Sequence, residues 1–521
     1  MARFKSLYFL LILSFVQSQS ASDAVRLIEN EVGYGARSLA LGGAYTAMGN
    51  DHSGMYWNPA GLANIENGSI YIEAHNNRSL NRTTYLNEKT STPLSVSRVN
   101  GIGAIVPIPT VRGSLVFGIG FNRVKHYDAL MNFSGFSTED NGLKFPITVD
   151  GIQQSHFFSK NVNRSETVAS IGAMEQLTFS FGIALSPNLS GGLSLSRVNG
   201  DEKYDFEFSQ NDIKNNFTEF PKDFNKYDLV QSLDTESKAW QIRGGLKFIL
   251  SKWFRMGFSL SLPYTISVIE RHGTNEVLTF DNGDTSDAID AGYYNYKVKA
   301  PMIMDFGGAF TFEAFTLSSS FRTIDWSSMR FDLSNIEVNS EDYKYLRNEN
   351  DIFKFQYDYF AIQIRLGIET LIQLNENFGI TFRGGYASIP SPSKNAYVKD
   401  YYSIGAGIPI DSNVMLDLAW ILNNQKKQSS DIYTPAGTDE KIIQQNKLQI
   451  TVEDNGIGRE QSEKLKRPNQ QHKPFATKAN EERVHLYKNK LKRDIAIITN
   501  DLYDENGVAA GTKVVITMPI Q

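Results

Sequence analysis

Hydrophobic and polar residues alternate along much of the chain after residue 100. In the clearest run, residues 177–185, Leu, Phe, Phe, Ile and Leu alternate with Thr, Ser, Gly and Ala. Ser186, Pro187 and Asn188 interrupt this run, and the alternation resumes over residues 192–196. A period of two residues places successive side chains on opposite faces of a β-strand. Two such runs joined by a short turn predict a β-hairpin.

The same pattern predicts further strands. Residues 115–121 present Leu115, Phe117, Ile119 and Phe121 on one face. Three more hairpins are predicted from residues 241–250 with 255–262, 364–374 with 378–386, and 402–408 with 414–420. Long polar segments at residues 196–238 and 270–299 alternate with the short turns, and we expect these segments to be loops.

The composition helps to distinguish two all-β architectures. A soluble β-sandwich would also alternate, but here the apolar face is dominated by Phe, Leu and Ile, while the opposite face is small and polar. Aromatic residues make up 12% of the chain, and the mean hydropathy is −0.32. After residue 20, no apolar run reaches the length of a spanning helix. Export to a membrane would therefore require a closed β-barrel.

The first twenty residues have the pattern of a secretory leader. Arg3 and Lys5 precede an apolar run at residues 7–16. Ser18 and Ser20 supply small residues at the −3 and −1 positions, which predicts cleavage before Ala21. The chain contains no Cys, which excludes disulfides, thiolate metal sites and Cys nucleophiles.

Residues 33–64 are rich in Gly and Ala and contain the sequence Tyr56-Trp57-Asn58-Pro59. Small residues allow close backbone packing, and Pro59 restricts both itself and Asn58. The composition alone is compatible with an ordinary Gly-rich loop or with a compact plug inside a barrel.

This segment closely resembles the N-terminal signature of FadL-type outer-membrane transporters of long-chain fatty acids and other hydrophobic compounds. Residues 323–327 and 364–386 resemble later segments of that family, and the resemblance covers about residues 25–450. It implies an all-β fold: a transmembrane antiparallel barrel of about 14 strands, with an N-terminal hatch in its lumen. The hatch motif falls on Gly42, Gly43, Asn58, Pro59 and Ala60.

The resemblance implies residues 21–100 as the hatch and first strand region, and residues 101–450 as the barrel. It implies passive transport of hydrophobic small molecules across the bacterial outer membrane, in contact with its lipid and without a cofactor. We expect the backbone around Gly42, Gly43 and Gly49 to be the mobile part of the hatch.

The C-terminal residues depart from this pattern. A charged, helix-forming segment at residues 460–491 precedes two predicted strands, at 494–502 and 512–519. Residues 451–521 resemble the second half of the ATP-binding domain of LytS-like sensor histidine kinases, an α/β half-domain. Its nucleotide-binding positions would be Asp454, Gly456 and Gly458 in a D-x-G-x-G box, with Gly511 and Thr512 in a later Gly-Thr element.

The regions that would carry a phosphoacceptor His and an Mg²⁺-binding Asn are absent from this resemblance, so we expect no enzyme activity. The alternative function is an ATP-binding signalling protein with a barrel sensor. Residues 446–452 fit either the last barrel strand or the strand before the D-x-G-x-G box.

Other chemistry is excluded by composition and spacing. The seven His residues are scattered, without a metal-binding pair. The net charge of −5 gives no support for nucleic-acid binding.

Overall fold

The structure is a computed structural model. It describes residues 20–29, 33–149, 152–220, 222–338, 340–358, 360–375, 378–394, 398–411, 414–429, 441–454, 496–503 and 509–517, with the backbone alone from residue 424 onward. The predicted leader, residues 1–20, lies outside the described residues except for Ser20.

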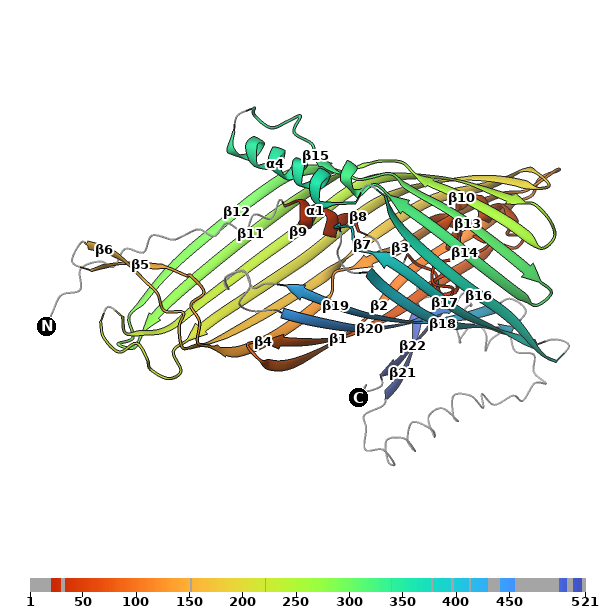
Figure 1. The fold of residues 1–521 in the computed structure, drawn as a ribbon. Helices are drawn as coiled ribbons and strands as arrows, with labels where there is room; N and C mark the ends of the chain where they lie inside the picture. Colours follow the sequence, from red (N-terminus) through yellow and green to blue (C-terminus); the bar gives the residue numbers. More distant parts are fainter. Residues whose placement is uncertain are drawn as a thin grey trace.

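Long antiparallel strands build most of the molecule (Figure 1). The strands of the main sheet are β1 (Ser69–Tyr85), β2 (Glu88–Ile108), β3 (Leu115–His126), β4 (Ala129–Ser137), β7 (Val162–Ser186), β8 (Leu189–Asn211), β9 (Phe224–Ile249), β10 (Phe254–Ser261), β11 (Thr265–Phe280), β12 (Thr285–Lys299), β13 (Ile303–Phe312), β14 (Phe315–Ile324), β15 (Arg330–Phe331), β16 (Ala361–Asn375), β17 (Phe378–Pro390), β18 (Val398–Asp411), β19 (Val414–Ser429) and β20 (Lys441–Asp454).

The sheet closes on itself. The ladders run β1–β2–β3–β7–β8–β9–β10–β13–β14–β16–β17–β18–β19–β20, and β20 pairs with β1. Three strands of the ring are interrupted and continue as a second strand. β3 continues as β4, since both pair with β7, and β10 continues as β11, since both pair with β9. In the same way β12 continues into β13, since these pair with β11 and β10. All four predicted hairpins are therefore confirmed, as β7–β8, β9–β10, β16–β17 and β18–β19.

The barrel wall is apolar outside and polar inside near the short turns. On β3 the side chains of Phe117, Ile119 and Phe121 are exposed, as the alternation predicts. On β8, Leu195 is exposed while its neighbour Ser196 is buried. This distribution is the inverse of that in a soluble protein and is typical of a wall that faces lipid.

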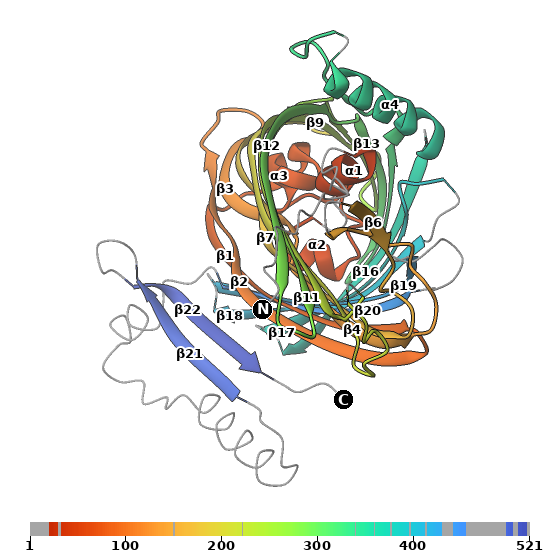
Figure 2. The ribbon, with the colours of Figure 1, turned by 90° about the vertical axis from the view of Figure 1, so that its left-hand side faces the viewer.

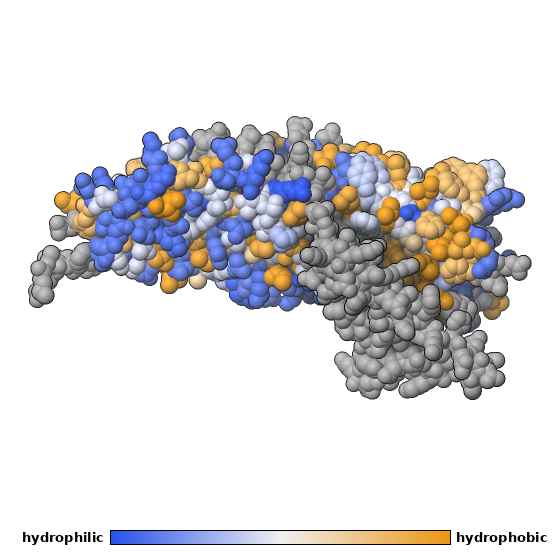
Figure 3. Space-filling view, turned by 90° about the horizontal axis from the view of Figure 1, so that it is seen from below, coloured by the Kyte–Doolittle hydropathy of each residue, from blue (hydrophilic) through white to orange (hydrophobic). Residues whose placement is uncertain are grey.

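The polar segments at residues 196–238 and 270–299 are strands for most of their length, so the prediction of loops there is wrong. They form the far parts of β8, β9, β11 and β12. Their alternation continues with the opposite sense: Glu207 of β8 is exposed and Phe208 is buried. The outer face is therefore apolar near the short turns and polar in the far part of the barrel. Figure 3 shows this division, with a hydrophilic left end and apolar residues gathered toward the right.

The segment before β1 lies inside the ring of strands (Figure 2). It forms α1 (Ala21–Ile28), α2 (Ala36–Ala40), α3 (Gly54–Trp57) and the 3₁₀ helix η1 (Pro59–Asn64). Tyr34, Tyr45 and Trp57 of this segment are fully buried, and they share one hydrophobic cluster with α1 and the inner faces of the strands.

Two smaller elements belong to the connections. The hairpin of β5 (Phe145–Val149) and β6 (Ile152–His156) packs Phe145 into an aromatic cluster with Phe158 and Phe224. The helix α4 (Glu341–Gln356) lies on the outside of the ring, after the short 3₁₀ helix η2 (Trp326–Ser328) (Figure 2). None of the described helices has the length and apolar character needed to cross a bilayer.

At the C-terminus, residues 446–452 are part of β20 and complete the barrel ring. β21 (Ala496–Tyr503) and β22 (Ala509–Thr517) form a separate two-stranded sheet. The two predicted strands therefore exist, although the second begins at Ala509 rather than at residue 512. The predicted helix at residues 460–491 lies outside the described residues.

Candidate functional site

Residues 36–64, called the plug below, fill the lumen near the short turns. Glycines on the wall meet the plug directly: a Cβ on Gly257 of β10 would collide with Thr46, and one on Gly385 of β17 with Gly42. Gly257 lies near the short-turn end of β10, and Gly385 lies in the middle of β17. The small inward residues thus let the plug touch the wall backbone.

Asn58 connects two parts of the plug to the wall. Its side-chain oxygen accepts a hydrogen bond from the Ala60 backbone N–H (3.1 Å) and caps η1, which begins at Pro59. Its amide nitrogen donates to the Thr46 carbonyl (2.7 Å) and to the Leu246 carbonyl of β9 (3.0 Å). The predicted motif residues Asn58, Pro59 and Ala60 therefore form one turn.

Gly42 and Gly43 form the turn after α2. Both have positive φ, 64° and 74°. A Cβ on Gly42 would lie 2.7 Å from the backbone nitrogen of Tyr386, and one on Gly43 would lie 2.6 Å from the Trp57 ring. Both the backbone conformation and the space exclude a side chain at these positions.

Wall side chains bind the backbone carbonyls of the plug. These bonds run from Ser194 Oγ to Met55 (2.8 Å), from Lys247 Nζ to Met48 (2.7 Å), from Ser403 Oγ to Ala40 (3.1 Å) and from Arg243 to Tyr56. Three strands, β8, β9 and β18, contribute these residues, so the plug is bound to several parts of the barrel wall by noncovalent contacts.

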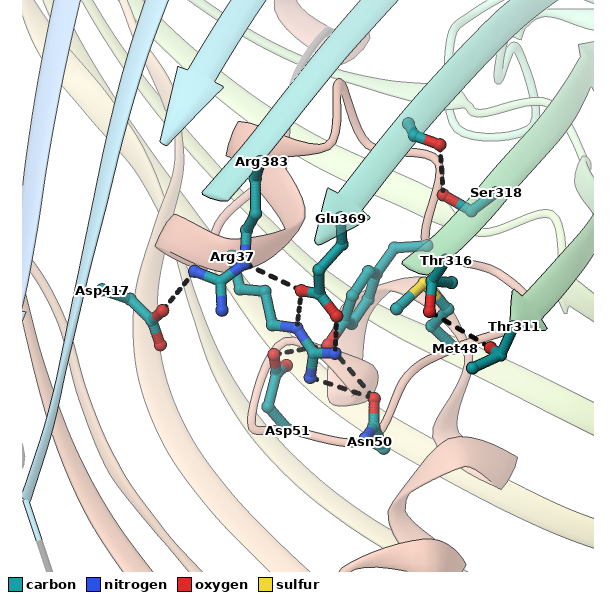
Figure 4. Close-up of polar contacts among 12 residues, drawn as sticks. Arg37, Met48, Asn50, Asp51, Thr311, Thr316, Ser318, Glu369, Arg383 and Asp417 are labelled. Carbon is teal, nitrogen blue, oxygen red and sulfur yellow. Dashed lines mark hydrogen bonds and ion pairs between the residues drawn. The ribbon is translucent and has the colours of Figure 1, made fainter. Parts of the chain in front are cut away.

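An ion-pair network holds one side of the plug (Figure 4). Arg37 of α2 binds Glu369 of β16 through two contacts of 2.8 Å. Arg383 of β17 binds the same carboxylate (2.8 Å) and also binds Asp417 of β19. Two guanidinium groups therefore share Glu369, which fixes the plug relative to three neighbouring strands.

Within the plug, Asp51 continues this network. It accepts hydrogen bonds from Tyr45 Oη (2.5 Å) and Ser53 Oγ (2.6 Å). Burial alone would raise the pKa of the Asp51 carboxyl, but His52, Arg37 and the hydroxyls outweigh it and hold that pKa below its usual range. Burial raises the pKa of Tyr45 well above its usual value. At neutral pH Asp51 is ionised and Tyr45 is neutral.

A column of alternating cations and aromatic rings holds Tyr56 and Trp57 of the plug. The guanidinium of Arg243 lies 4.7 Å from the Tyr56 ring centre, and that of Arg322 lies 5.7 Å from Tyr56 and 5.2 Å from Trp57. Arg365 lies 5.4 Å from Trp57 on another side. All three arginines are buried, and Arg322 also binds Asp305 (2.7 Å). Cation–π contacts of this kind are strongest where water is excluded.

The predicted motif residues all lie in the plug, but the wall arginines that contact the neighbouring Tyr56 and Trp57 were not predicted from the sequence. Arg243, Arg322 and Arg365 lie at inward positions of strands whose outward positions are apolar. A charged residue in the small-polar register of such a strand is the signal that would have revealed them.

The predicted nucleotide positions belong to different parts of the chain. Asp454 ends β20 in the barrel, whereas Gly511 and Thr512 lie in β22 and pair with Leu502 and Asp501. Gly456 and Gly458 lie outside the described residues. Across the described residues, no group of three His, Asp or Glu side chains could hold a metal ion.

No family model and no curated protein sequence matches the chain. Solved structures do resemble it in fold. The toluene transporter TodX of Pseudomonas putida is 14% identical, with a TM-score of 0.51 over 82% of this chain and 98% of TodX. A FadL homologue of Pseudomonas aeruginosa is 11% identical, with a TM-score of 0.50 over 82% of this chain and 97% of the homologue. The chain therefore has the β-barrel fold of these proteins.

Proposed function

We propose that the protein is an outer-membrane channel through which hydrophobic small molecules diffuse passively. The observation that carries the proposal is a closed barrel, apolar outside near the short turns, whose lumen is filled there by a segment that contacts the wall only through noncovalent interactions. A channel that admits apolar solutes while excluding water and salts needs such a removable obstruction.

The architecture supports this proposal. With each interrupted strand counted once, the described ring has 14 members, the number that the FadL resemblance implies. In outer-membrane barrels the short turns face the periplasm, so the plug would be the hatch of that family and would close the periplasmic end. The fold neighbours are described as a toluene transporter and a FadL homologue.

The physical chemistry of a greasy solute suits this route. Burial of each CH₂ group is favourable by about 0.8 kcal/mol, so a solute would partition from water into the aromatic and aliphatic interior without an energy source. The substrates would be long-chain fatty acids or similar hydrophobic compounds, and the plug would shift to let them pass.

A cross-link tests the proposal cleanly because the chain has no native Cys. The Thr46 backbone nitrogen lies 3.2 Å from Ser320 Oγ of β14, so T46C/S320C would tie the plug to the wall. Cells that carry the oxidised variant should lose uptake of labelled long-chain fatty acid and labelled toluene, and a reductant should restore it.

The matched control is T178C/S196C, which joins two wall strands, β7 and β8, across an Oγ1–Oγ distance of 2.8 Å. Oxidation of this pair should leave uptake unchanged. Equal uptake by oxidised and reduced T46C/S320C would refute a moving plug.

The nucleotide-binding alternative stays a prediction. It is tested by titrating the full-length protein with labelled ATP, with a D454N variant as the control.

A further inference from the structure

The first residue after the predicted leader lies in an unusual place. Ala21 is 1% exposed, and its backbone nitrogen lies 2.6 Å from Oε2 of Glu349 on α4. Glu349 is also buried, 8% exposed. The two residues are 328 positions apart in the sequence, so the contact is a tertiary one between α1 and α4.

The Glu349 carboxylate has no cation of its own among the described residues. The ion pairs on α4 join Lys344 to Glu341 and Lys354 to Asp351, both on its exposed surface. The other groups close to Glu349 include the neutral hydroxyls of Tyr345 and Tyr357. A buried carboxylate without a cation is costly, whereas a well-placed positive charge makes its burial acceptable.

The sequence supplies such a charge at this position. Cleavage before Ala21 breaks the Ser20–Ala21 peptide bond with one water molecule. At neutral pH the products are a carboxylate on Ser20 and an α-ammonium on Ala21. We infer that the mature N-terminus is itself a structural group: the Ala21 α-ammonium forms a buried ion pair with Glu349 and locks α1 against α4.

The surroundings of α1 fit a helix that is anchored at both ends. Arg26, in its last turn, binds both carboxylate oxygens of Glu202 on β8 at 2.7 Å. Its first turn carries Asp23, whose pKa is raised by burial. An ammonium at a helix N-terminus is disfavoured by the helix dipole, and the Glu349 carboxylate offsets this effect. Leader removal would thus complete the packing of α1 inside the barrel, whichever solute the barrel carries.

The inference is tested on the full chain, exported with its leader and purified from the outer membrane. Intact mass and N-terminal sequencing should place Ala21 first. Amide exchange of residues 24–29 then reports how firmly α1 is held. E349Q should speed this exchange about tenfold or more, because the buried ammonium loses its counter-charge. E341Q, on the exposed face of the same helix, should leave it unchanged.

A second variant of the chain distinguishes an ion pair between Ala21 and Glu349 from a neutral hydrogen bond between them. One Gly inserted between Ser20 and Ala21 keeps the residues before the cleavage site but moves the ammonium one residue upstream, and Ala21 keeps a neutral N–H. In that background E349Q should change the exchange less than twofold, because the side-chain oxygen of Gln can still accept a hydrogen bond from the neutral N–H of Ala21. Equal acceleration in both backgrounds would overturn the inference.

Chemical labelling provides a measurement that needs no inserted residue. An amine-reactive ester should modify Lys344, which is 58% exposed, much faster than the Ala21 α-amine. E349Q should raise Ala21 labelling relative to Lys344. A mature chain that begins elsewhere, or an Ala21 amine that reacts as fast as Lys344 in the unaltered protein, would also overturn the inference.

Discussion

Arg37 of the plug and Glu369 of the barrel wall form a two-pronged ion pair, with Nε–Oε2 and Nη2–Oε1 distances of 2.8 Å. Both side chains are mostly buried, at 19% and 13% exposure. A planar guanidinium on a carboxylate fixes direction as well as distance. This pair therefore sets the orientation of α2 against β16, which a single hydrogen bond could not do.

R37Q should loosen the plug without unfolding the barrel. Removal of one partner of a mostly buried pair costs about 3 kcal/mol, which corresponds to an increase of about 100-fold in the open population. Single-channel recordings in planar bilayers should show this increase as more frequent opening. K344Q, which removes an exposed pair on α4, is the control, and unchanged opening in R37Q would contradict a role for this pair in docking the plug.

W57L should weaken a second set of contacts between the plug and the wall. The Trp57 ring lies between the guanidiniums of Arg322 and Arg365, and loss of both cation–π contacts costs about 2 kcal/mol. We expect normal heat-modifiable migration on gels but raised conductance. The matched control is W253L, at a half-exposed residue in a short turn of the barrel. Conductance that rises equally in both variants would show that the effect is not specific to the column.

The period-two alternation was sufficient to predict the strands near the short turns, because large apolar residues outside and small polar residues inside make the contrast strong. The far parts of β8 and β9 are rich in charged residues, and this composition predicts loops although the side chains there still alternate with a period of two. The alternation in fact continues from Leu195 to Glu207 on one face, and only the solvent changes. If the barrel is an outer-membrane channel, as proposed, the change in polarity along this face marks where the barrel leaves the membrane.

The contacts of the plug could not be predicted in the same way. Arg37 and Glu369 are separated by 332 residues, and no periodicity relates them. The motif at Asn58 was visible because its chemistry is local: a cap followed by Pro59. The sequence can indicate the wall residue of such an ion pair, because a charged residue at an inward position of a strand requires an opposite charge inside the lumen. It does not indicate which residue of the plug supplies that charge.

The plug should resist moderate acid. Since the pKa of Asp51 is held below its usual value of 3.8, its stabilising contribution is complete above that pH and is lost as the pH falls below it. Protease accessibility of the plug in detergent should stay constant from pH 7 to about 5 and rise below about 4. In the D51N variant, the plug should be accessible to protease at every pH, and acid should change this accessibility little. If the protease accessibility of the plug in the unaltered protein changed between pH 5 and 7, titratable groups other than Asp51 would determine its stability.

Two substitutions on the outward face of β8 test where the membrane ends. Leu195 and Asp201 point to the same side of the same strand and are both exposed. L195R would place a charge against lipid, which costs about 2 to 4 kcal/mol near the bilayer centre, so folding into vesicles should become less favourable by that amount. D201R exchanges one hydrated charge for another and should fold as the unaltered protein does. Urea titrations of folding into phospholipid vesicles measure both, and equal free energies of unfolding would mean that the apolar face near the short turns is not in contact with lipid.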